Sequence, residues 1–473
     1  DRLWPLLYDI NKVMMPRQAN LSQVLDTDAV GTHWTYQEDL PFLQGPSAGQ
    51  PVLAAFGEDS VALVWLEGDG NAASLRWVSG TWDQETGESS WEMPVTLHEP
   101  GAGRAMHPQM AFDPTGIAHL LWLQDAEAGP PQVFYARCEG DTCSEPLQVS
   151  DPSAQACEGG SRSGDALPSR APAIAVDGTG AVLAVWGAPE GGLANATWPS
   201  DEPSPLPAQG CVPSGEISAQ GPRLAGSDAG HTLAFVQGGE PDGDITLLRF
   251  ADGAWVSSPE AIGNGSSPEI WTDLAGSTLA AWCDEDASLR YWDGSSLETI
   301  SDLSCTGRPE IGQDSSGQIH VVFPSDEVES TSGIRSSREV LYESIRDSAG
   351  WSDPMIVALP GAATQPSLAS SAEGILHLSW AEGEASESSL RYAFQHQYDC
   401  EGYELTGAAA AVLQVAGRPE YRSPDDPIAY CQNRYDRLVH APNPAPEFSD
   451  QSPTTNGSFD TLAELMSGAQ YEV

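Results

Sequence analysis

Basic residues are scarce in this chain. Lysine occurs once, as Lys12, and lysine and arginine together number 20 against 68 aspartates and glutamates, so the formal net charge is −48. A surface this acidic repels the phosphates of nucleic acids and anionic lipids, and we expect neither as a partner. Two interpretations of the charge stay open. One is a solubilising coat suited to a salty or hot exterior; the other is a surface protein whose carboxylates Ca²⁺ neutralises before subunits approach one another.

Long apolar runs and familiar catalytic motifs are also missing. No run approaches the ~18 apolar residues of a membrane-spanning helix, so we predict no membrane span. The sequence contains no Gly-x-Ser-x-Gly, no His-Glu-x-x-His and no phosphate-binding glycine loop. These are common signatures of nucleophile, metal-hydrolase and nucleotide sites, and their absence favours a protein without enzymatic activity.

The cysteines follow neither a zinc nor a redox pattern, because no Cys-x-x-Cys occurs among the eight. We therefore predict disulfides, and extracellular or cell-surface localisation. Pairing in sequence order, one of about 105 pairings that eight cysteines allow, gives Cys138–Cys143, Cys157–Cys211, Cys283–Cys305 and Cys400–Cys431. Four Asn-x-Ser/Thr sites permit glycosylation, at Asn20, Asn195, Asn264 and Asn456.

One pattern occurs seven times in the same register. In residues 108–122, PQMAFDPTGIAHLLW, a proline is followed after seven residues by a glycine and after five more by a tryptophan. The other copies begin at Pro51, Pro172, Pro222, Pro268, Pro309 and Pro366. Copies spaced by roughly 50 residues indicate a propeller, a solenoid or an array.

Alternation and turn residues predict four antiparallel strands in each copy, and hence an all-β, seven-bladed β-propeller. The first strand begins at the proline, and the second runs to the tryptophan. Between them we expect a turn formed by the repeat's glycine and an aspartate, at Asp113, Asp177, Asp273 or Asp314. The third strands carry arginines that we expect to form equivalent ion pairs, namely Arg76, Arg249, Arg290 and Arg391.

These repeats divide the chain into an N-terminal extension (1–45), a propeller (46–399) and a C-terminal extension (400–473). The seventh repeat lacks a fourth strand after Tyr392, so we expect the N-terminal extension to supply it and close the ring. The C-terminal extension contains a proline-rich run and the segment SFDTLAELMSGAQ, which we predict to be a short helix.

The Asp-x-x-Gly turns, the strands that end in tryptophan and the Trp-Ser-x-Pro at residues 351–354 resemble the repeats of sialidase-like (Asp-box, or BNR) propellers. The resemblance covers residues 50–398 and implies the propeller architecture. The strict Ser-x-Asp-x-Gly-x-Thr-Trp box is absent, as is the Phe/Tyr-Arg-Ile-Pro segment with which such enzymes place an arginine on the substrate carboxylate. This chain contains seven copies of the repeat, whereas a true sialidase is expected to have six, and the difference argues against a true sialidase.

Two groups of side chains are candidates for binding. Five lie within a few residues of the start of a first strand, on the face where the longest loops gather: Arg104, His107, Arg170, Arg223 and Arg308. Arginines there could hold a carboxylate with two hydrogen bonds, or simply neutralise acidic loops. The second group lies in acidic clusters after the second strands, where Asp242, Asp244, Asp284 and Asp286 are candidate Ca²⁺ ligands or ordinary solvated hairpin tips.

Two functions are compatible with these features. The leading hypothesis is a non-catalytic extracellular propeller that serves as a surface, adhesion or self-assembling subunit, with its extensions contacting neighbouring copies or other surface proteins. The alternative is a secreted glycan-binding or glycan-hydrolysing propeller, in which Arg170, Arg223 and Arg308 hold an acidic sugar. No cofactor other than Ca²⁺ is suggested.

Overall fold

The computed structural model describes residues 30–399 with short gaps. The segments within this range that it leaves out are 35–37, 41–47, 69–72, 84–87, 100–102, 126–129, 151–156, 158–170, 189–191, 200–206, 214–218, 239–242, 257, 273–275, 302, 332–333, 348–349, 358–362 and 384–387. The predicted helix near residue 460 and most of both extensions therefore lie outside the described residues.

Every regular element in the described part of the chain is a β-strand, and all strand pairs are antiparallel. The first sheet contains β3 (Ala48–Phe56), β4 (Ser60–Glu67), β5 (Ser74–Asp83), β6 (Glu88–Trp91) and β7 (Val95–His98). The second contains β8 (Ala105–Phe112), β9 (Ala118–Gln124), β10 (Gln132–Glu139), β11 (Thr142–Cys143) and β12 (Leu147–Gln148). The third contains β13 (Ala173–Val176), β14 (Val182–Gly187), β15 (Leu193–Trp198) and β16 (Ala208–Cys211).

The remaining sheets include one that is twice as wide. It contains β17 (Ala219–Ser227), β18 (Gly230–Gln237), β19 (Gly243–Ala251), β20 (Ala254–Trp255), β21 (Glu260–Thr272), β22 (Thr278–Cys283), β23 (Leu289–Trp292) and β24 (Leu297–Ser301). The next contains β25 (Glu310–Gln313), β26 (Ile319–Thr331), β27 (Ile334–Asp347), β28 (Gly350–Trp351) and β29 (Met355–Ile356). The last contains β30 (Ala363–Ser370), β31 (Leu376–Glu382) and β32 (Ser389–Asp399), together with β1 (Val30–Trp34) and β2 (Glu38–Asp39).

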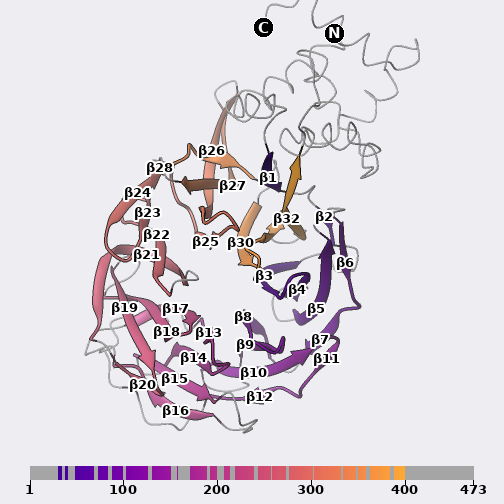
Figure 1. Ribbon diagram of the computed structural model, residues 1–473, viewed down its shortest axis with the longest axis vertical. Coiled ribbons are helices and arrows are strands. Elements are labelled where there is room, and N and C mark those ends of the chain that lie inside the picture. The colour runs from indigo at the N-terminus through magenta and orange to yellow at the C-terminus, as the bar shows by residue number, and fades with distance from the viewer. Residues whose placement is uncertain are drawn as a thin grey trace, which may run out of the picture.

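The sheets are arranged radially around a common centre (Figure 1). Their innermost strands contact one another in a closed circuit, in the order β3, β8, β13, β17, β21, β25, β30 and back to β3. Radial antiparallel sheets that close on themselves in this way form a β-propeller. The all-β propeller architecture expected from the repeats is therefore present.

The outer strands of the last sheet come from the other end of the chain. β1 pairs with β32, with Val30 opposite Asp399, and β2 pairs with the same strand, with Glu38 opposite Tyr392. The outer edge of β32 is thus hydrogen-bonded to residues far away in the sequence. An unpaired edge at this position would be open to intermolecular strand pairing.

The turn between the first two strands of a repeat depends on an aspartate and a glycine. Asp113 Oδ1 accepts hydrogen bonds from the backbone N–H groups of Thr115 (2.9 Å) and Ile117 (3.0 Å). Gly116 has a φ of 86°, which glycine adopts without the steric cost that a Cβ imposes. The same turn occurs at Asp177 and Asp314, as predicted.

The hydrophobic core lies between neighbouring sheets. The tryptophans that end the second strands are fully buried in four sheets, at Trp65, Trp122, Trp282 and Trp380. Aromatic pairs also join adjacent sheets: Trp91 meets Tyr392 edge-on with ring centroids 5.0 Å apart, and Trp351 meets Tyr291 in the same manner at 5.0 Å. Each such pair adds ~0.5–1.5 kcal/mol beyond its burial, which stabilises the ring against opening.

Candidate functional site

A cavity of about 610 Å³ lies at the centre of the ring, where the innermost strands begin. Several sheets contribute equivalent residues to its wall. The wall consists of Gln50, Pro51, Val52, His107, Pro108, Gln109, Gln220, Gly221, Arg223, Val236, Ser267, Pro268, Gly307, Arg308, Pro324, Glu339, Thr364, Gln365 and Pro366. A cavity of this size accommodates a small organic ligand, and we refer to it as the axial pocket.

The innermost strands are bulged at the repeat proline. The pairing of first and second strands shifts register there in five places, between Gly49 and Val52, Met106 and Gln109, Gln220 and Arg223, Ser266 and Glu269, and Thr364 and Ser367. A bulge leaves its extra residues out of the ladder and redirects their side chains. In each case, the residue that precedes the proline lines the axial pocket.

Two glutamine side chains connect neighbouring sheets around the pocket. Gln365 Oε1 accepts a hydrogen bond from the backbone N–H of Gln50 (2.7 Å), and Gln50 Oε1 accepts one from the backbone N–H of His107 (2.8 Å). The bulge has removed these N–H groups from the strand ladder, so the amides replace the missing partners. The amide chain therefore fixes the three pocket residues relative to one another.

Two arginines of the wall, Arg223 and Arg308, alternate with two glutamates that are not part of the lining, Glu269 and Glu310. Arg223 Nε donates to Glu269 Oε2 at 3.0 Å, and Arg308 Nε lies 3.4 Å from the same oxygen. Arg308 also holds Glu310 Oε1, through Nε at 2.9 Å and Nη2 at 2.7 Å. This Arg–Glu cluster spans three repeats. The exposed fractions of its side chains are 13% for Arg223, 17% for Glu269, 28% for Arg308 and 8% for Glu310.

The cluster's environment shifts its proton affinities. Burial raises the pKa of Glu310 to about 7, against the opposing attraction of Arg308. Burial and the charge of Arg308 lower the pKa of Arg223 to about 10. The pKa of Arg308 is raised, because Glu310 and Glu269 together outweigh the effect of its burial. Both guanidinium groups therefore stay charged at neutral pH, while Glu310 is close to its midpoint.

His107 faces this positive region. Partial desolvation, followed by the charges of Arg223, Arg104 and Arg308, lowers the pKa of His107. The imidazole is therefore neutral at pH 7, with one nitrogen as a donor and the other as an acceptor. A site with two guanidinium groups, primary amides and a neutral imidazole can bind an anion and neighbouring neutral polar groups.

The structure brings together three of the five predicted pocket residues. His107, Arg223 and Arg308 line the axial pocket. Arg104 lies close enough for its charge to act on His107, but its side chain is not part of the wall. Arg170 lies outside the described residues. The prediction overlooked Gln50 and Gln365, although their positions directly before a repeat proline were a signal that could have identified them.

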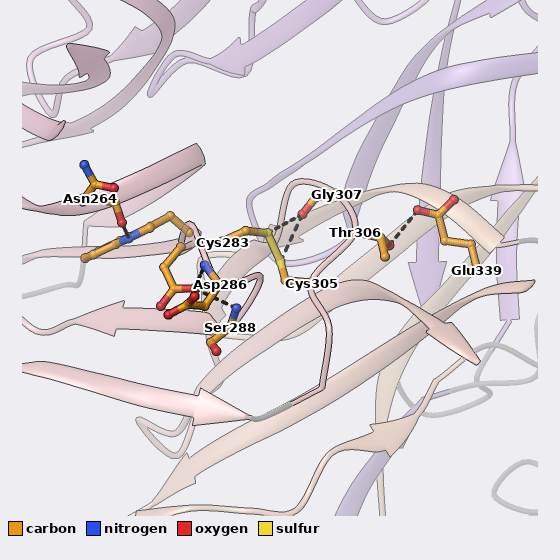
Figure 2. The surroundings of a disulfide bond; sticks show 10 residues. Asn264, Cys283, Asp286, Ser288, Cys305, Thr306, Gly307 and Glu339 are labelled. Carbon is orange, nitrogen blue, oxygen red and sulfur yellow. Dashed lines mark hydrogen bonds between the residues drawn. A yellow bond between two sulfur atoms is a disulfide. The ribbon is translucent and has the colours of Figure 1, made fainter. Parts of the chain in front are cut away.

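A disulfide anchors the segment that carries Arg308 (Figure 2). Cys283 and Cys305 are bonded, and the carbonyl oxygen of Gly307 lies 3.0 Å from Cys283 Sγ. Thr306 Oγ1 donates to Glu339 Oε1 at 2.9 Å, which ties the same segment to β27. The segment Cys305–Gly307 is thus held from two sides, so Arg308 follows a constrained stretch of backbone.

Two further predicted disulfides are confirmed, Cys138–Cys143 and Cys157–Cys211. The predicted pair Cys400–Cys431 lies outside the described residues. Such bonds are typical of oxidising compartments. No helix in the described part of the chain is long and apolar enough to cross a membrane. Of the glycosylation motifs, Asn195 is only 6% exposed, which leaves no room for a glycan on its amide.

The acidic residues after the second strands form ion pairs with the third-strand arginines. Arg290 Nε lies 2.6 Å from Asp284 Oδ2, and Arg76 Nε lies 3.4 Å from Glu67 Oε2. Arg391 pairs with Glu382 in the same way. The predicted equivalent ion pairs are therefore present in three repeats.

These ion pairs bear on the proposed calcium ligands. Asp284 Oδ1 additionally accepts the N–H groups of Asp286 and Ser288, so donors engage both of its oxygens. Asp244 and Asp286 are exposed, and Asp242 lies outside the described residues. Among the described residues, no three His, Cys, Asp or Glu side chains are grouped to hold a metal ion. Calcium binding stays a prediction from the sequence.

Three histidines that share one position in the second strands are buried, at His119, His320 and His377. His320 lies between two carboxylates, with Nδ1 2.7 Å from Glu343 Oε1 and Nε2 3.3 Å from Asp314 Oδ2. His377 instead hydrogen-bonds the hydroxyl group of Tyr392 at 2.9 Å. These contacts give the three histidines a structural role inside the blades.

The sequence matches no protein-family model and no curated protein. Solved structures with some similarity include a protein of unknown function from Dyadobacter fermentans, with a TM-score of 0.46, 10% identity and coverage of 78% of this chain and 100% of that one. The NanB sialidase from Streptococcus pneumoniae has a TM-score of 0.42 and 12% identity, covering 77% and 70%. The Aleuria aurantia lectin has a TM-score of 0.38 and 13% identity, covering 64% and 98%.

Proposed function

We propose that this protein is an extracellular binding propeller that holds the carboxylate of an acidic glycan in its axial pocket. The observation that carries the proposal is the pair of guanidinium groups in the pocket wall. Arg223 Nε and Nη1 have partners in Glu269 and the carbonyl of Pro222, and Arg308 Nε and Nη2 have Glu310. In the part of the chain that the structure describes, Arg223 Nη2 and Arg308 Nη1 have no hydrogen-bond acceptor, so both can donate to a ligand.

The glutamates of the cluster support this role by positioning the arginines. An arginine that is already held by a carboxylate loses less side-chain entropy when it binds a second one. A carboxylate bound by charged donors gains ~1.5–3 kcal/mol for each hydrogen bond. The remaining wall is made of amides, prolines and a neutral imidazole, a mixture that suits the polar edges and apolar faces of a sugar ring. We propose binding without turnover.

We infer that the propeller has seven blades. The sequence contains seven repeat frames, and the double-width sheet covers two of them. β21 explains the difference, because its residues Glu260–Gly265 pair with β19 whereas Ser266–Thr272 pair with β22. One long strand therefore serves as the outer strand of one blade and the inner strand of the next. We also propose that β1 and β2 complete the last blade.

The proposal predicts that Arg223→Gln weakens the binding of glucuronate by about tenfold or more, the equivalent of one lost charge-assisted hydrogen bond. Arg223 is the suitable position because Glu269 keeps Arg308 as a partner after the substitution. Isothermal titration calorimetry on the folded variant gives the affinity. Arg76→Gln is the matched control, since Arg76 pairs with Glu67 outside the pocket and its loss should leave the affinity unchanged. Equal affinities for wild type and Arg223→Gln, or no binding by wild type, would refute the proposal.

A role in self-assembly is a second proposal, and it rests on the sequence of the C-terminal extension, which lies outside the described residues. Deleting residues 440–473 should then convert an oligomer into a folded monomer. Size-exclusion chromatography with light scattering measures the mass, and circular dichroism checks the fold. An unchanged oligomer profile would count against this role.

A further inference from the structure

Residues of the axial pocket adopt a backbone conformation that side chains normally avoid. The residue before the repeat proline has a positive φ in five repeats: 49° at Gln50, 50° at His107, 59° at Gly221, 52° at Ser267 and 53° at Gln365. This left-handed region costs a residue with a Cβ ~1–2 kcal/mol, whereas glycine adopts it freely. One repeat uses glycine, so the others keep a side chain at an energetic cost.

Strain of this kind collects where a side chain is needed for function. For the two glutamines, the hydrogen bonds determine which amide atom is the oxygen Oε1 and which is the nitrogen Nε2. A backbone N–H can only donate, so the atom that accepts from Gln50 N and from His107 N must be the Oε1 of Gln365 and of Gln50 respectively. Each Nε2 then keeps its two N–H donors. Among the described residues, neither Nε2 has a protein acceptor.

These groups match a hydroxyl group better than they match an apolar surface. A hydroxyl both donates and accepts. The amide Nε2 groups donate, and neutral His107 supplies one donor and one acceptor. Gln365, Gln50 and His107 come from three repeats that are neighbours around the closed ring. All three line the axial pocket, and its wall also contains Arg223 and Arg308.

We propose that Gln50, His107 and Gln365 are the specificity-determining residues of the axial pocket, and that they select carboxylates that carry several hydroxyl groups, such as hexuronic acids. This inference rests on the proposed function, because the arginines hold the carboxylate. A carboxylate without hydroxyl groups would cover the amide donors and leave them unpaired. A buried donor without a partner costs ~1–3 kcal/mol, so the pocket rejects such ligands.

The test compares three probes of similar size: glucuronate, cyclohexanecarboxylate and glucose. Wild-type protein should bind glucuronate at least about tenfold more tightly than cyclohexanecarboxylate. This ratio corresponds to the free-energy cost of one unpaired donor. In Gln365→Gly this preference should fall severalfold, because glucuronate loses a hydrogen bond and cyclohexanecarboxylate no longer leaves an amide donor unpaired, so that its affinity stays equal or rises. Gln50→Gly should behave in the same way. Calorimetric titration of each probe provides all of these values.

Glycine is the informative replacement because Gly221 already occupies the equivalent position with φ 59°. The variants lose the amide without straining the backbone, and thermal unfolding confirms that they fold. A purely structural glutamine would lower the affinities for both carboxylates equally, and that outcome overturns the inference.

The probes also separate this inference from the proposed function. If wild-type protein binds glucuronate and cyclohexanecarboxylate equally well, the specificity role is wrong and carboxylate binding stands. If it binds neither, or binds glucose as tightly as glucuronate, carboxylate binding itself is wrong, and the inference fails with it.

Discussion

Replacing His320 by leucine should lower the free energy of unfolding by about 3–5 kcal/mol, the usual cost of removing one partner from a buried ionic group. His320 is 2% exposed and lies between Asp314 and Glu343, which are also buried. Burial opposes its charge, but hydrogen bonds to Asp314 and Glu343 outweigh this and raise the pKa of His320 to about 9. The imidazolium is therefore present at neutral pH, and its loss would leave two buried carboxylates without their cation. Urea unfolding followed by tryptophan fluorescence measures the change.

The same residue makes stability depend on pH with a definite sign. Since the pKa rises from 6.5 in the unfolded chain to about 9 in the folded one, the stabilisation by His320 is complete below pH 6.5. It is lost as the pH rises from 6.5 to about 9. His377→Leu is the matched control, because His377 has the equivalent position but a tyrosine partner, and burial lowers its pKa to about 3. Above pH 6.5 the control variant should keep the wild-type pH dependence. If His320→Leu also keeps it, the charge assignment is wrong.

The affinity for glucuronate should rise about tenfold when the pH falls from 8.5 to 6.5. Over this range Glu310, whose pKa burial raises to about 7, takes up a proton. The groups that face it are Arg308, Glu269, Arg223 and the backbone N–H of Leu368. Protonation changes the net charge of the Arg–Glu cluster from zero to +1. One unit charge a few ångströms from a bound anion contributes ~3–4 kcal/mol at an effective dielectric constant of about 20, more than enough for the expected change.

Glu310→Gln isolates this effect. The variant should bind glucuronate tightly at both pH values, because the amide cannot become negative. Glu339→Gln removes a carboxylate that lines the pocket and lies outside the Arg–Glu cluster, and it should leave the pH dependence intact. Fluorescence or calorimetric titration at the two pH values provides the comparison. An affinity that is independent of pH in wild type, or that falls on acidification, would show that Glu310 does not control the site.

Much of the fold was predictable because each repeat contains the local information for its own strands and turns. Asp113 and Gly116 are three residues apart and specify the turn between them, and the tryptophan six residues after the glycine marks the end of the buried second strand. The pairing of Cys138 with Cys143 was predictable for the same reason, since a short hairpin places them opposite each other. Three of the third-strand arginines, Arg76, Arg290 and Arg391, find their carboxylates within the same blade.

The candidate site was less accessible to sequence reasoning. Arg223 and Arg308 stood out because arginine is rare, but nothing near them in the sequence identified Glu269 as the carboxylate that both would contact. The hydrogen bond from Gln50 to Gln365 joins residues 315 positions apart, which only ring closure brings together. The left-handed conformation before the prolines was hidden as well, because that position normally favours extended backbone.

The amino-acid sequence by itself determined the strand content, the repeat frame, the turns, the disulfide across the Cys138–Cys143 hairpin and the presence of arginine near the axis. These features depend on contacts within one repeat or between adjacent ones. Only the tertiary structure decided which contacts the first strands of the repeats make with one another at the centre of the ring. Closing the ring crowds their bulged ends together, which pairs Arg308 with Glu269 and Glu310 and connects Gln365, Gln50 and His107. Such contacts depend on the order of blades around an axis, and no single repeat contains that order.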